Sequence, residues 1–416
     1  MIQKITLPNG LRLVYEHIPH VRSVSLGLWL GVGSRFETAA ESGASHFIEH
    51  LLFKGTATRS ATELAEEMDQ LGGQINAFTT KECTCFYGRV LDQNLRRTVD
   101  LLADIFLRSR FSDADIEAEQ KIISEEIDMY EDSPEDLVSD VLIDSVFAPN
   151  ALSMPVLGTK ASLAGLTRDS LLTYKSAHYT PGRLVIAISG NFTEADLDYI
   201  RTIFAAMPPG SATSPEAAIY TPGLVLRKKS IEQNHLCLLL PGLATDSEDR
   251  YAGQLLNNIL GGGISSRLFQ TVREQHGLCY NVYSFGVSFQ ELGLLGVYAA
   301  LGSETEEKAL GLILAILRDL RDKGVTPGEL DRARDQVKSN ILMSLESTSA
   351  RMNTLGKNEL TRGHIPTPEE TITRYDAVTL DSIRTLAERL IDFNRLSFSA
   401  VGEVADEAKY RKLLSL

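Results

Sequence analysis

Two stretches of the chain repeat one pattern. T-R-D-S-L-L begins at Thr167 and leads to R-L-V-I-A-I-S-G at Arg183–Gly190, and T-L-D-S-I-R begins at Thr379 and leads to R-L-S-F-S-A-V-G at Arg395–Gly402. Each predicts a helix followed by an apolar strand that ends at glycine. Equivalent residues are separated by a constant 212 positions, since 379 − 167 = 212 and 402 − 190 = 212. This offset, about half of the 416-residue length and far too long for a solenoid, predicts two related domains.

The boundary between the two domains is expected in residues 207–216, which read M-P-P-G-S-A-T-S-P-E. Their proline, glycine and serine content disfavours regular structure. We therefore expect a first domain over residues 1–209, a linker over 210–223 and a second domain over 224–416. Helices and strands are mixed in both halves without strict βαβ alternation. The sequence therefore predicts an α+β fold in which each domain is a mostly antiparallel sheet flanked by helices.

The hydrophobic periodicity predicts individual elements in both halves. In the first half, strands are expected at 11–18, 24–31, 74–79 and 84–90, and helices at 46–54, 62–71, 93–108 and 113–131. In the second half, strands are expected at 224–229 and 235–240, and helices at 248–259, 265–275, 304–323 and 327–345.

The composition narrows the class of protein. Hydrophobic residues make up 43% and charged residues 23% of the chain, which provides enough apolar material for folded cores. Acidic residues outnumber basic ones 55 to 41, and the net charge of −14 argues against a nucleic-acid partner and favours cationic ones. No apolar run reaches the roughly 18 residues that a membrane span requires, so no membrane partner is expected.

The cysteines and the N-terminal residues indicate the compartment. Residues 1–10 lack the apolar core of a secretory signal. The cysteines form neither a C-x-x-C pair nor the dense pattern of a disulfide scaffold, and reduced, mostly buried thiols are expected at Cys83, Cys85, Cys237 and Cys279. A cytoplasmic location is the expectation that fits both observations.

The segment His46-Phe-Ile-Glu49-His50 carries the clearest chemical signal. On a helix, His46 and His50 lie four residues apart on one face, and Glu49 lies beside them. Two imidazoles so placed can hold one Zn²⁺ while the carboxylate activates water, and the pattern is the inverted form of H-E-x-x-H. The rest of the helix is nearly all apolar, so a metal would offset the cost of burying both imidazoles. As a bare pattern, a surface helix with two unrelated histidines is the alternative.

A third ligand is expected from the predicted helix over 113–131, for which Ser112 is a suitable N-cap. Glu119 and Glu126 are seven residues apart and lie on or beside the apolar stripe of this helix, where a carboxylate needs a partner. Spacing alone leaves Glu125 and Glu126 open as the ligand. The structural alternative is an acidic, solvent-facing helix.

Seven motifs, in order along most of the chain, resemble one known family. They are L-P-N-G-L at 7–11, G-S-R-F-E at 33–37, H-F-I-E-H-L-L-F-K-G-T at 46–56, N-A-F-T-T-K-E at 76–82, S-E-E-I-D-M at 124–129, G-G-G-I-S-S-R-L-F at 261–269 and V-R-E-Q-H-G-L-C-Y at 272–280. The sequence resembles the pitrilysin, insulinase and mitochondrial processing peptidase family of zinc metallopeptidases. His50 and Glu126 are separated by 75 residues (126 − 50 − 1 = 75), a spacing similar to that in the processing-peptidase branch of the family. The sequence thus resembles the bacterial members of that branch.

The resemblance implies a zinc endopeptidase that hydrolyses peptides or unfolded, presequence-like segments. Glu49 would be the general base, and Glu119 would match a second functional carboxylate that the family places seven residues before the ligand. For that reason the resemblance favours Glu126 over Glu125. It implies one Zn²⁺ per chain, held by His46, His50 and Glu126.

The resemblance also implies how substrate binds. In the family, substrate is added as a strand to a sheet edge beside the metal, and the matching residues here are Asn76, Ala77 and Phe78. Arg273 and Tyr280 would hold the substrate carbonyl and stabilise the oxyanion. Without the family, Asn76 reads as a turn or edge residue, Arg273 as a helix-surface charge and Tyr280 as an ordinary strand aromatic.

The length of the chain bears on how many copies assemble into one active molecule. The family's clam-shell molecules are built from halves of about this length, each of two related domains, and the metal and the Arg/Tyr pair face each other across the two halves. Because this chain carries both sets, the resemblance favours a homodimer with composite active sites. The competing reading is a non-catalytic structural or assembly subunit, as some family members are.

Overall fold

The computed structural model describes residues 2–210 and 214–414, and its strands form two sheets. The first sheet has the order β1-β2-β6-β3-β5-β4, with strands at Ile2–Thr6, Arg12–His17, Leu184–Gly190, Ser23–Leu30, Thr84–Leu91 and Gln74–Thr79. The second has the order β7-β11-β8-β10-β9, with strands at Leu224–Lys228, Ser397–Gly402, Asn234–Gly242, Gly293–Leu301 and Cys279–Ser288. Residues 211–213 of the expected linker lie outside the described residues.

The internal repeat is visible in the topology. Without β1, the first sheet has the same strand order as the second, since β2, β6, β3, β5 and β4 correspond to β7, β11, β8, β10 and β9. Each sheet has one parallel pair, β2 with β6 and β7 with β11, and its other pairs are antiparallel. Helix α7 (Arg168–His178) maps onto α14 (Leu380–Leu390) because 168 + 212 = 380 and 178 + 212 = 390. The predicted α+β fold of two related domains is confirmed.

The helices divide between two compact units, each of three chain segments: Met1–Asp128, Met154–Glu216 and Leu342–Thr367 in the first, and Met129–Ser153, Ala217–Ile341 and Pro368–Leu416 in the second. Helices of the first unit are α1 (Ala44–Leu52), α2 (Ala61–Leu71), α3 (Leu95–Arg108), most of α4 (Asp113–Glu131), α6 (Lys160–Gly165), α7, α8 (Glu194–Ala205) and α12 (Thr348–Arg362). Those of the second are α5 (Pro134–Phe147), α9 (Arg250–Gly261), α10 (Glu306–Lys323), most of α11 (Pro327–Ser344), α13 (Pro368–Asp376), α14 and α15 (Glu407–Leu414).

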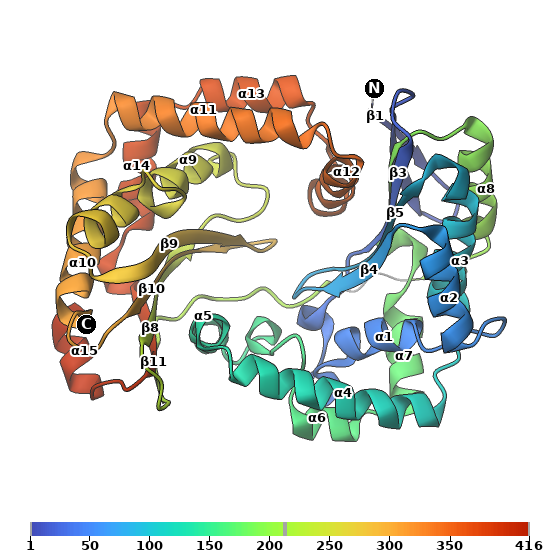
Figure 1. The fold of residues 1–416 in the computed structure, drawn as a ribbon, viewed down its shortest axis with the longest axis horizontal. Helices are drawn as coiled ribbons and strands as arrows, with labels where there is room; N and C mark the ends of the chain where they lie inside the picture. Colours follow the sequence, from blue (N-terminus) through green and yellow to red (C-terminus); the bar gives the residue numbers. More distant parts are fainter. Residues whose placement is uncertain (1, 211–213, 415–416) are drawn as a thin grey trace. The chain divides into compact units, whose positions relative to one another are not determined.

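Both faces of the first sheet are covered (Figure 1). Side chains alternate across a strand, so Leu26 and Leu28 of β3 join the main core with helices α1, α3, α7 and α8. Trp29 of the same strand points to the other face, where it packs with Met352 and Leu355 of α12. Helix α12 therefore belongs to the first unit although it lies late in the sequence.

Polar contacts fasten α12 to the first sheet. Glu359 is 1% exposed and pairs with Lys4 of β1 at 2.6 Å and with Arg12 of β2 at 3.4 Å. The indole N–H of Trp29 lies 3.3 Å from the sulfur of Met352. Removing the cationic partners would leave the buried Glu359 carboxylate uncompensated, so these contacts favour one position of the helix.

In the second unit α5 takes the equivalent place. Its residues Val138, Leu142 and Val146 pack with Leu239 of β8 and Tyr298 of β10. The repeat maps α5 onto positions 346–359 (134 + 212 and 147 + 212), which overlap α12. Each sheet is thus covered by a helix that lies on the other side of residues 210–223 in the sequence, so the compact units are not the two continuous ranges that we expected.

One predicted helix has a different form. The range 265–275 contains a π-helix over Phe269–Gln275, in which each backbone hydrogen bond spans five residues instead of the four of an α-helix. Among residues 2–210 and 214–414, no helix is both long and apolar enough to cross a membrane.

Candidate active site

Helix α1 carries the H-x-x-E-H motif, and its apolar face holds it against the core of the first unit. Phe47, Ile48 and Leu51 are buried in the first unit's core. The helix begins after Gly43, whose φ of +93° strongly favours glycine. A side chain at Gly43 would also come within 2.9 Å of the Leu157 carbonyl oxygen.

The N-terminal end of α1 is held by a carboxyl group from outside the helix. Glu37 is 4% exposed and accepts hydrogen bonds from the backbone N–H groups of Gly43 and Ser45, both at 2.7 Å. These groups have no partner within the helix, so Glu37 takes the role of an N-cap. Burial raises the pKa of Glu37 to about 8, against the effect of the two backbone hydrogen bonds.

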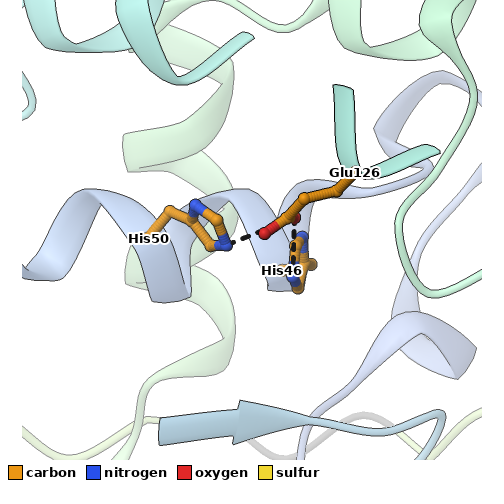
Figure 2. A group of neighbouring side chains, drawn as sticks. All are labelled: His46, His50 and Glu126. Carbon is orange, nitrogen blue, oxygen red and sulfur yellow. Dashed lines mark ion pairs between the residues drawn. The ribbon is translucent and has the colours of Figure 1, made fainter. Parts of the chain in front are cut away.

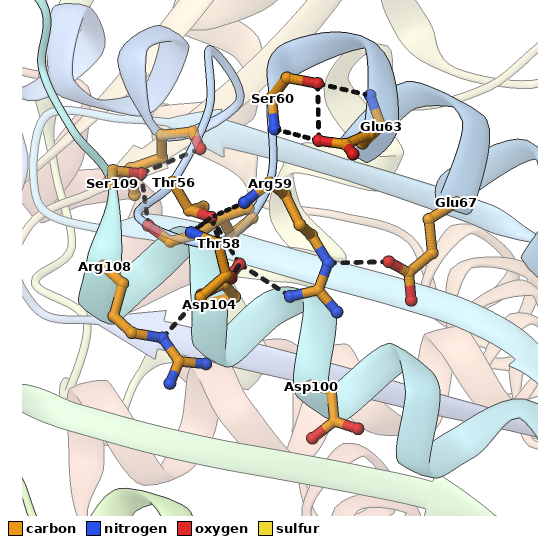
Figure 3. A network of polar contacts seen from close by, with 12 residues as sticks. Thr56, Thr58, Arg59, Ser60, Glu63, Glu67, Asp100, Asp104, Arg108 and Ser109 are labelled. Carbon is orange, nitrogen blue, oxygen red and sulfur yellow. Dashed lines mark hydrogen bonds and ion pairs between the residues drawn. The ribbon is translucent and has the colours of Figure 1, made fainter.

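The loop that follows α1 is fastened to α3 by the buried carboxylate of Asp104 (Figure 3). Thr56 and Thr58 donate to it at 2.6 and 2.8 Å, and Arg59 and Arg108 pair with it at 2.7 and 2.6 Å. Burial alone would raise the pKa of Asp104, but the hydrogen bonds from Thr56, Arg59 and Thr58 outweigh it and lower the pKa to about 2. The helix that carries the motif is therefore held at both ends.

We expect Asp104→Asn to lower the free energy of unfolding at pH 7 by about 3 kcal/mol, because it removes one partner of a buried ion-pair network. The folded pKa of Asp104 lies below its ordinary value of 3.8. Its contribution is therefore present above pH 3.8 and is lost as the pH falls through about 2, so the difference from wild type should shrink in acid. Urea unfolding at pH 7 and pH 2.5 measures this.

A matched control is Asp128→Asn, which breaks an exposed ion pair with Lys160. We expect it to cost less than about 1 kcal/mol. Equal losses for the two variants, or a loss at Asp104 that does not change with pH, would contradict the role assigned to the buried network.

Three candidate metal ligands come together in the first unit (Figure 2). His46 and His50 project from α1, and Glu126 reaches toward them from α4. Glu126 Oε2 lies 3.8 Å from His46 Nε2 and 3.6 Å from His50 Nε2, and the three ligand atoms lie within 4.8 Å of one another. Of the two carboxylates that spacing left open, Glu126 joins the histidines and Glu125 is exposed.

The donor set fits zinc. Two imidazole nitrogens and one carboxylate oxygen are ligands that Zn²⁺ takes in catalytic sites, where a fourth position stays open. The buried Oε2 of Glu126 has no hydrogen-bond partner among the described residues, and its distances to the two imidazoles exceed hydrogen-bond length. A buried carboxylate oxygen without a donor is costly, and a cation shared with His46 and His50 would satisfy it.

A second group of charges orients His50. Its Nδ1 lies 3.0 Å from Glu119 Oε2, so the ring donates there and turns Nε2 toward Glu126. Glu119 is also paired with Lys54 at 2.8 Å. Burial alone would raise the pKa of Glu119, but the hydrogen bonds from His50 and Lys54 lower it, so it is a carboxylate at neutral pH.

The two imidazoles differ in their protonation. Burial, together with the nearby charge of His50, lowers the pKa of His46 to about 3, so His46 is neutral, the form that binds a metal. Burial also acts to lower the pKa of His50, but the hydrogen bond to Glu119 and the charges of Glu126 and Glu119 raise it overall. A metal would compete with a proton at His50.

Glu49 lies on the same helix and is 9% exposed. Its carboxylate accepts a short hydrogen bond from the hydroxyl of Thr79, at the end of β4. Burial raises the pKa of Glu49, although the hydrogen bond from Thr79 and the charge of His50 oppose the shift. A buried carboxylate with a raised pKa is a suitable acceptor for a proton from water.

Strand β4 is one of the two edge strands of the first sheet, and β1 is the other. It contains Asn76, Ala77 and Phe78, and its other edge pairs with β5. Ile75 and Ala77 pack against the core that contains α1, whereas Phe78 contacts Trp29 on the opposite face with ring centroids 5.6 Å apart. The strand that we expected to pair with substrate therefore offers an open edge next to the helix with the H-x-x-E-H motif.

Arg273 and Tyr280 are neighbours in the second unit. The Arg273 guanidinium lies 4.8 Å from the Tyr280 ring centroid and 4.6 Å from that of Phe269. The Tyr280 side chain is 78% exposed. The roles expected for this pair in catalysis stay predictions.

Helix α9 of the second domain does not carry the metal motif. Helix α9 borders β9 as α1 borders β4, but it reads R-Y-A-G-Q-L-L-N-N-I-L-G and holds no histidine or carboxylate. Within the described parts of the chain, the only cluster of three or more metal-ligand side chains is that of His46, His50 and Glu126.

Sequence reasoning missed three residues that shape the site, namely Glu37, Lys54 and Thr79. Each lies in a quoted motif, but the motif does not say what the side chain touches. Lys54 is four residues after His50, a helical spacing that could have pointed to it. Glu37 and Thr79 act on α1 from other elements, and only tertiary structure reveals such contacts.

Comparison with known proteins identifies the family of the chain. The model of the insulinase family (peptidase family M16) matches residues 12–160, and that of the peptidase M16 inactive domain matches residues 165–337. The chain is 42% identical to an uncharacterized zinc protease, YmxG, of Bacillus subtilis over 94% of this chain and 96% of that one. It is 40% identical to another, SCO5738 of Streptomyces coelicolor, over 99% and 91%.

Solved structures share the fold. A crystal structure of a peptidase M16 inactive domain from Pseudomonas fluorescens has a TM-score of 0.91 and 20% identity, covering 97% of this chain and 98% of that one. A protease from Helicobacter pylori has a TM-score of 0.89 and 19% identity, covering 97% and 99%. The chain belongs to the insulinase family of peptidases, family M16, and relatives that it matches over nearly their whole length are named zinc proteases.

Proposed function

We propose that the protein is a zinc-dependent endopeptidase that binds one Zn²⁺ per chain through His46, His50 and Glu126. The observation that carries the proposal is the convergence of these donors on one point, with His50 oriented by Glu119 and an otherwise unpartnered oxygen on Glu126. When bound, zinc supplies a Lewis acid that polarises a peptide carbonyl and makes water a stronger acid.

Glu49 is proposed as the general base. It takes a proton from the attacking water and later delivers that proton to the leaving amine. Thr79 holds the carboxylate of Glu49, and the same hydrogen bond links the base to the strand that is proposed to bind substrate. Burial around Glu49 favours its protonated form, which assists the delivery step.

Substrate is proposed to add as a strand to the free edge of β4, along Asn76, Ala77 and Phe78. Main-chain hydrogen bonds would then supply most of the affinity, which suits peptides or unfolded segments of varied sequence, presequence-like ones included. Arg273 and Tyr280 are proposed to hold the carbonyl and stabilise its oxyanion. Their cation–π contact supports joint action, since it keeps both polar groups together.

The assembly proposed is a cytoplasmic homodimer with composite sites. Each chain would supply its zinc half to one site and Arg273 and Tyr280 to the other. This proposal rests on both sets being intact in one chain whose length matches nearly the whole of its relatives. The alternative, a non-catalytic assembly subunit, predicts neither a metal nor cleavage.

Removal and return of zinc test the function. We expect purified protein to contain about one zinc per chain, to lose peptide cleavage after chelation and to recover it with added zinc. Zinc content is measured by atomic emission, and cleavage with a library of fluorogenic peptides. A protein that holds no zinc and cleaves no member of a diverse library would support the non-catalytic alternative.

A further inference from the structure

A lysine on α7 lies in apolar surroundings, apart from the residues that the proposed mechanism uses. Lys175 is half-buried, and its ammonium nitrogen lies 5.9 Å from the ring centroid of Phe111 and 5.8 Å from that of Tyr179. Both rings are buried in the core of the first unit. The ammonium group therefore lies against two aromatic rings inside one compact unit, while part of the residue stays open to solvent.

No carboxylate balances the charge of this ammonium group. Other lysines of the first unit, such as Lys54 and Lys121, pair with a carboxylate at 2.8 and 2.9 Å. For Lys175, no ion pair or hydrogen bond of the ammonium group is found among residues 2–210 and 214–414, and its contacts with the two rings are cation–π contacts at the outer limit of distance. Burial, which no charged neighbour opposes, lowers the pKa of Lys175 from 10.5 to about 8.

The ring of Phe111 is held in place by an unusual backbone conformation. Its φ of +52° lies in the left-handed region, which bulky residues rarely adopt. Phe111 is 1% exposed, and its carbonyl oxygen accepts a hydrogen bond from Arg168 Nε at 2.8 Å. Packing and this hydrogen bond keep the residue in that conformation, so its ring is a fixed wall beside Lys175. Arg168, the charged group that contacts this wall, is a cation and cannot pair with the ammonium group.

These surroundings favour a reaction that leaves the nitrogen uncharged. A lysine is a nucleophile only as the neutral amine, and desolvation in an apolar pocket increases the share of that form. At pH 8 about half of Lys175 is neutral, against about 0.3% of a lysine with a pKa of 10.5. As for thiols, a lower pKa also weakens the nucleophile, which offsets part of this gain. Acylation converts the amine to an amide, which carries no charge and therefore suits apolar surroundings better than an ammonium group does.

We propose that Lys175 is a modification site for activated acyl groups, the class of acyl phosphates and thioesters, selected by its place beside Phe111 and Tyr179 without a carboxylate partner. The ammonium group first gives a proton to water. Nζ then attacks the acyl carbonyl carbon and a C–N bond forms. The bond from that carbon to the phosphate oxygen or the thiolate sulfur breaks, and the leaving group departs with the electron pair. The nitrogen then loses a second proton to water, which leaves a neutral amide.

Acylation rates of individual lysines test the site, and the test does not depend on peptide cleavage. The full chain is incubated at pH 8 with limiting acetyl phosphate or, in a second arm, with acetyl-coenzyme A, and acetylation of each lysine is followed by mass spectrometry. In at least one arm, we expect Lys175 of the folded protein to react about tenfold faster than the exposed Lys308 of α10, and no faster in urea. The arm with the excess identifies the class of donor. Equal rates for the two lysines in both arms, or an excess that persists in urea, would overturn the proposal.

A matched pair of variants tests the missing carboxylate. Leu172 lies three residues before Lys175 on α7, a spacing that brings two side chains together. Leu172→Glu supplies a carboxylate, and Leu172→Gln supplies an uncharged side chain of nearly the same shape, so both variants share any cost in packing. We expect the carboxylate to raise the pKa of Lys175 and to slow its acetylation about twofold relative to Leu172→Gln, while Lys308 reacts equally in both. Equal rates at Lys175 in two folded variants would overturn the role of the missing partner.

Discussion

Replacing Glu49 with glutamine is expected to lower kcat for peptide cleavage by about 10³-fold while the protein keeps its zinc. Glutamine has nearly the shape of glutamate and still accepts the hydrogen bond from Thr79, so α1 and β4 should stay in place. What it cannot do is take a proton from water. The expected loss therefore falls on the rate of the chemical step rather than on KM.

Measurements of zinc content and peptide binding show whether the loss of activity comes from the missing base or from a loss of zinc or substrate. Glu49→Gln should match wild type in zinc per chain and in affinity for a peptide, because the proposed ligands are His46, His50 and Glu126. The matched control is Glu125→Gln, which removes an exposed carboxylate next to Glu126 and should keep activity within about twofold. A variant at Glu49 that keeps more than a tenth of the activity would contradict its role as base, and one that loses zinc would show it to be a ligand.

The motif on α1 could be read from the sequence because helix periodicity alone brings His46, Glu49 and His50 to one side. The third ligand is different. Glu125 and Glu126 are about 100° apart around α4, and both are compatible with an acidic helix. The choice depends on which side of α4 packs toward α1, a contact between segments about 75 residues apart that no local pattern encodes.

The domain architecture, too, could be predicted only as far as local sequence patterns determine it. The offset of 212 was visible in the sequence, and the matching strand orders confirm the two related domains. The helices α5 and α12 were not predicted, and neither was the sheet that each covers. An amphipathic pattern indicates that a helix has an apolar face but not which sheet that face will meet. The ion pairs of the buried Glu359 with Lys4 and Arg12 join residues about 350 positions apart, so they appear only in the folded chain.

Two inactive variants mixed together are expected to recover about a quarter of wild-type activity if the active sites are composite. The variants are Glu49→Gln, which lacks the base, and Arg273→Ala, which lacks the proposed carbonyl ligand and should lose about 10²-fold in kcat or more. Random exchange of equal amounts makes about half of the dimers mixed. In each mixed dimer one site combines both lesions, and the other combines an intact zinc half with an intact Arg273 and Tyr280.

The recovery discriminates because a site formed within one chain would give none: every chain in the mixture carries one lesion, so no chain would hold a complete site. A second mixture, of Glu49→Gln with Glu126→Gln, controls for exchange itself. Both lesions then lie in the zinc half, so every composite site keeps a damaged zinc half and activity should stay at background. Exchange is verified by energy transfer between labelled chains. Verified exchange without recovery in the first mixture would contradict the composite site, and recovery in both mixtures would show that the gain does not come from pairing a zinc half with a partner's Arg273.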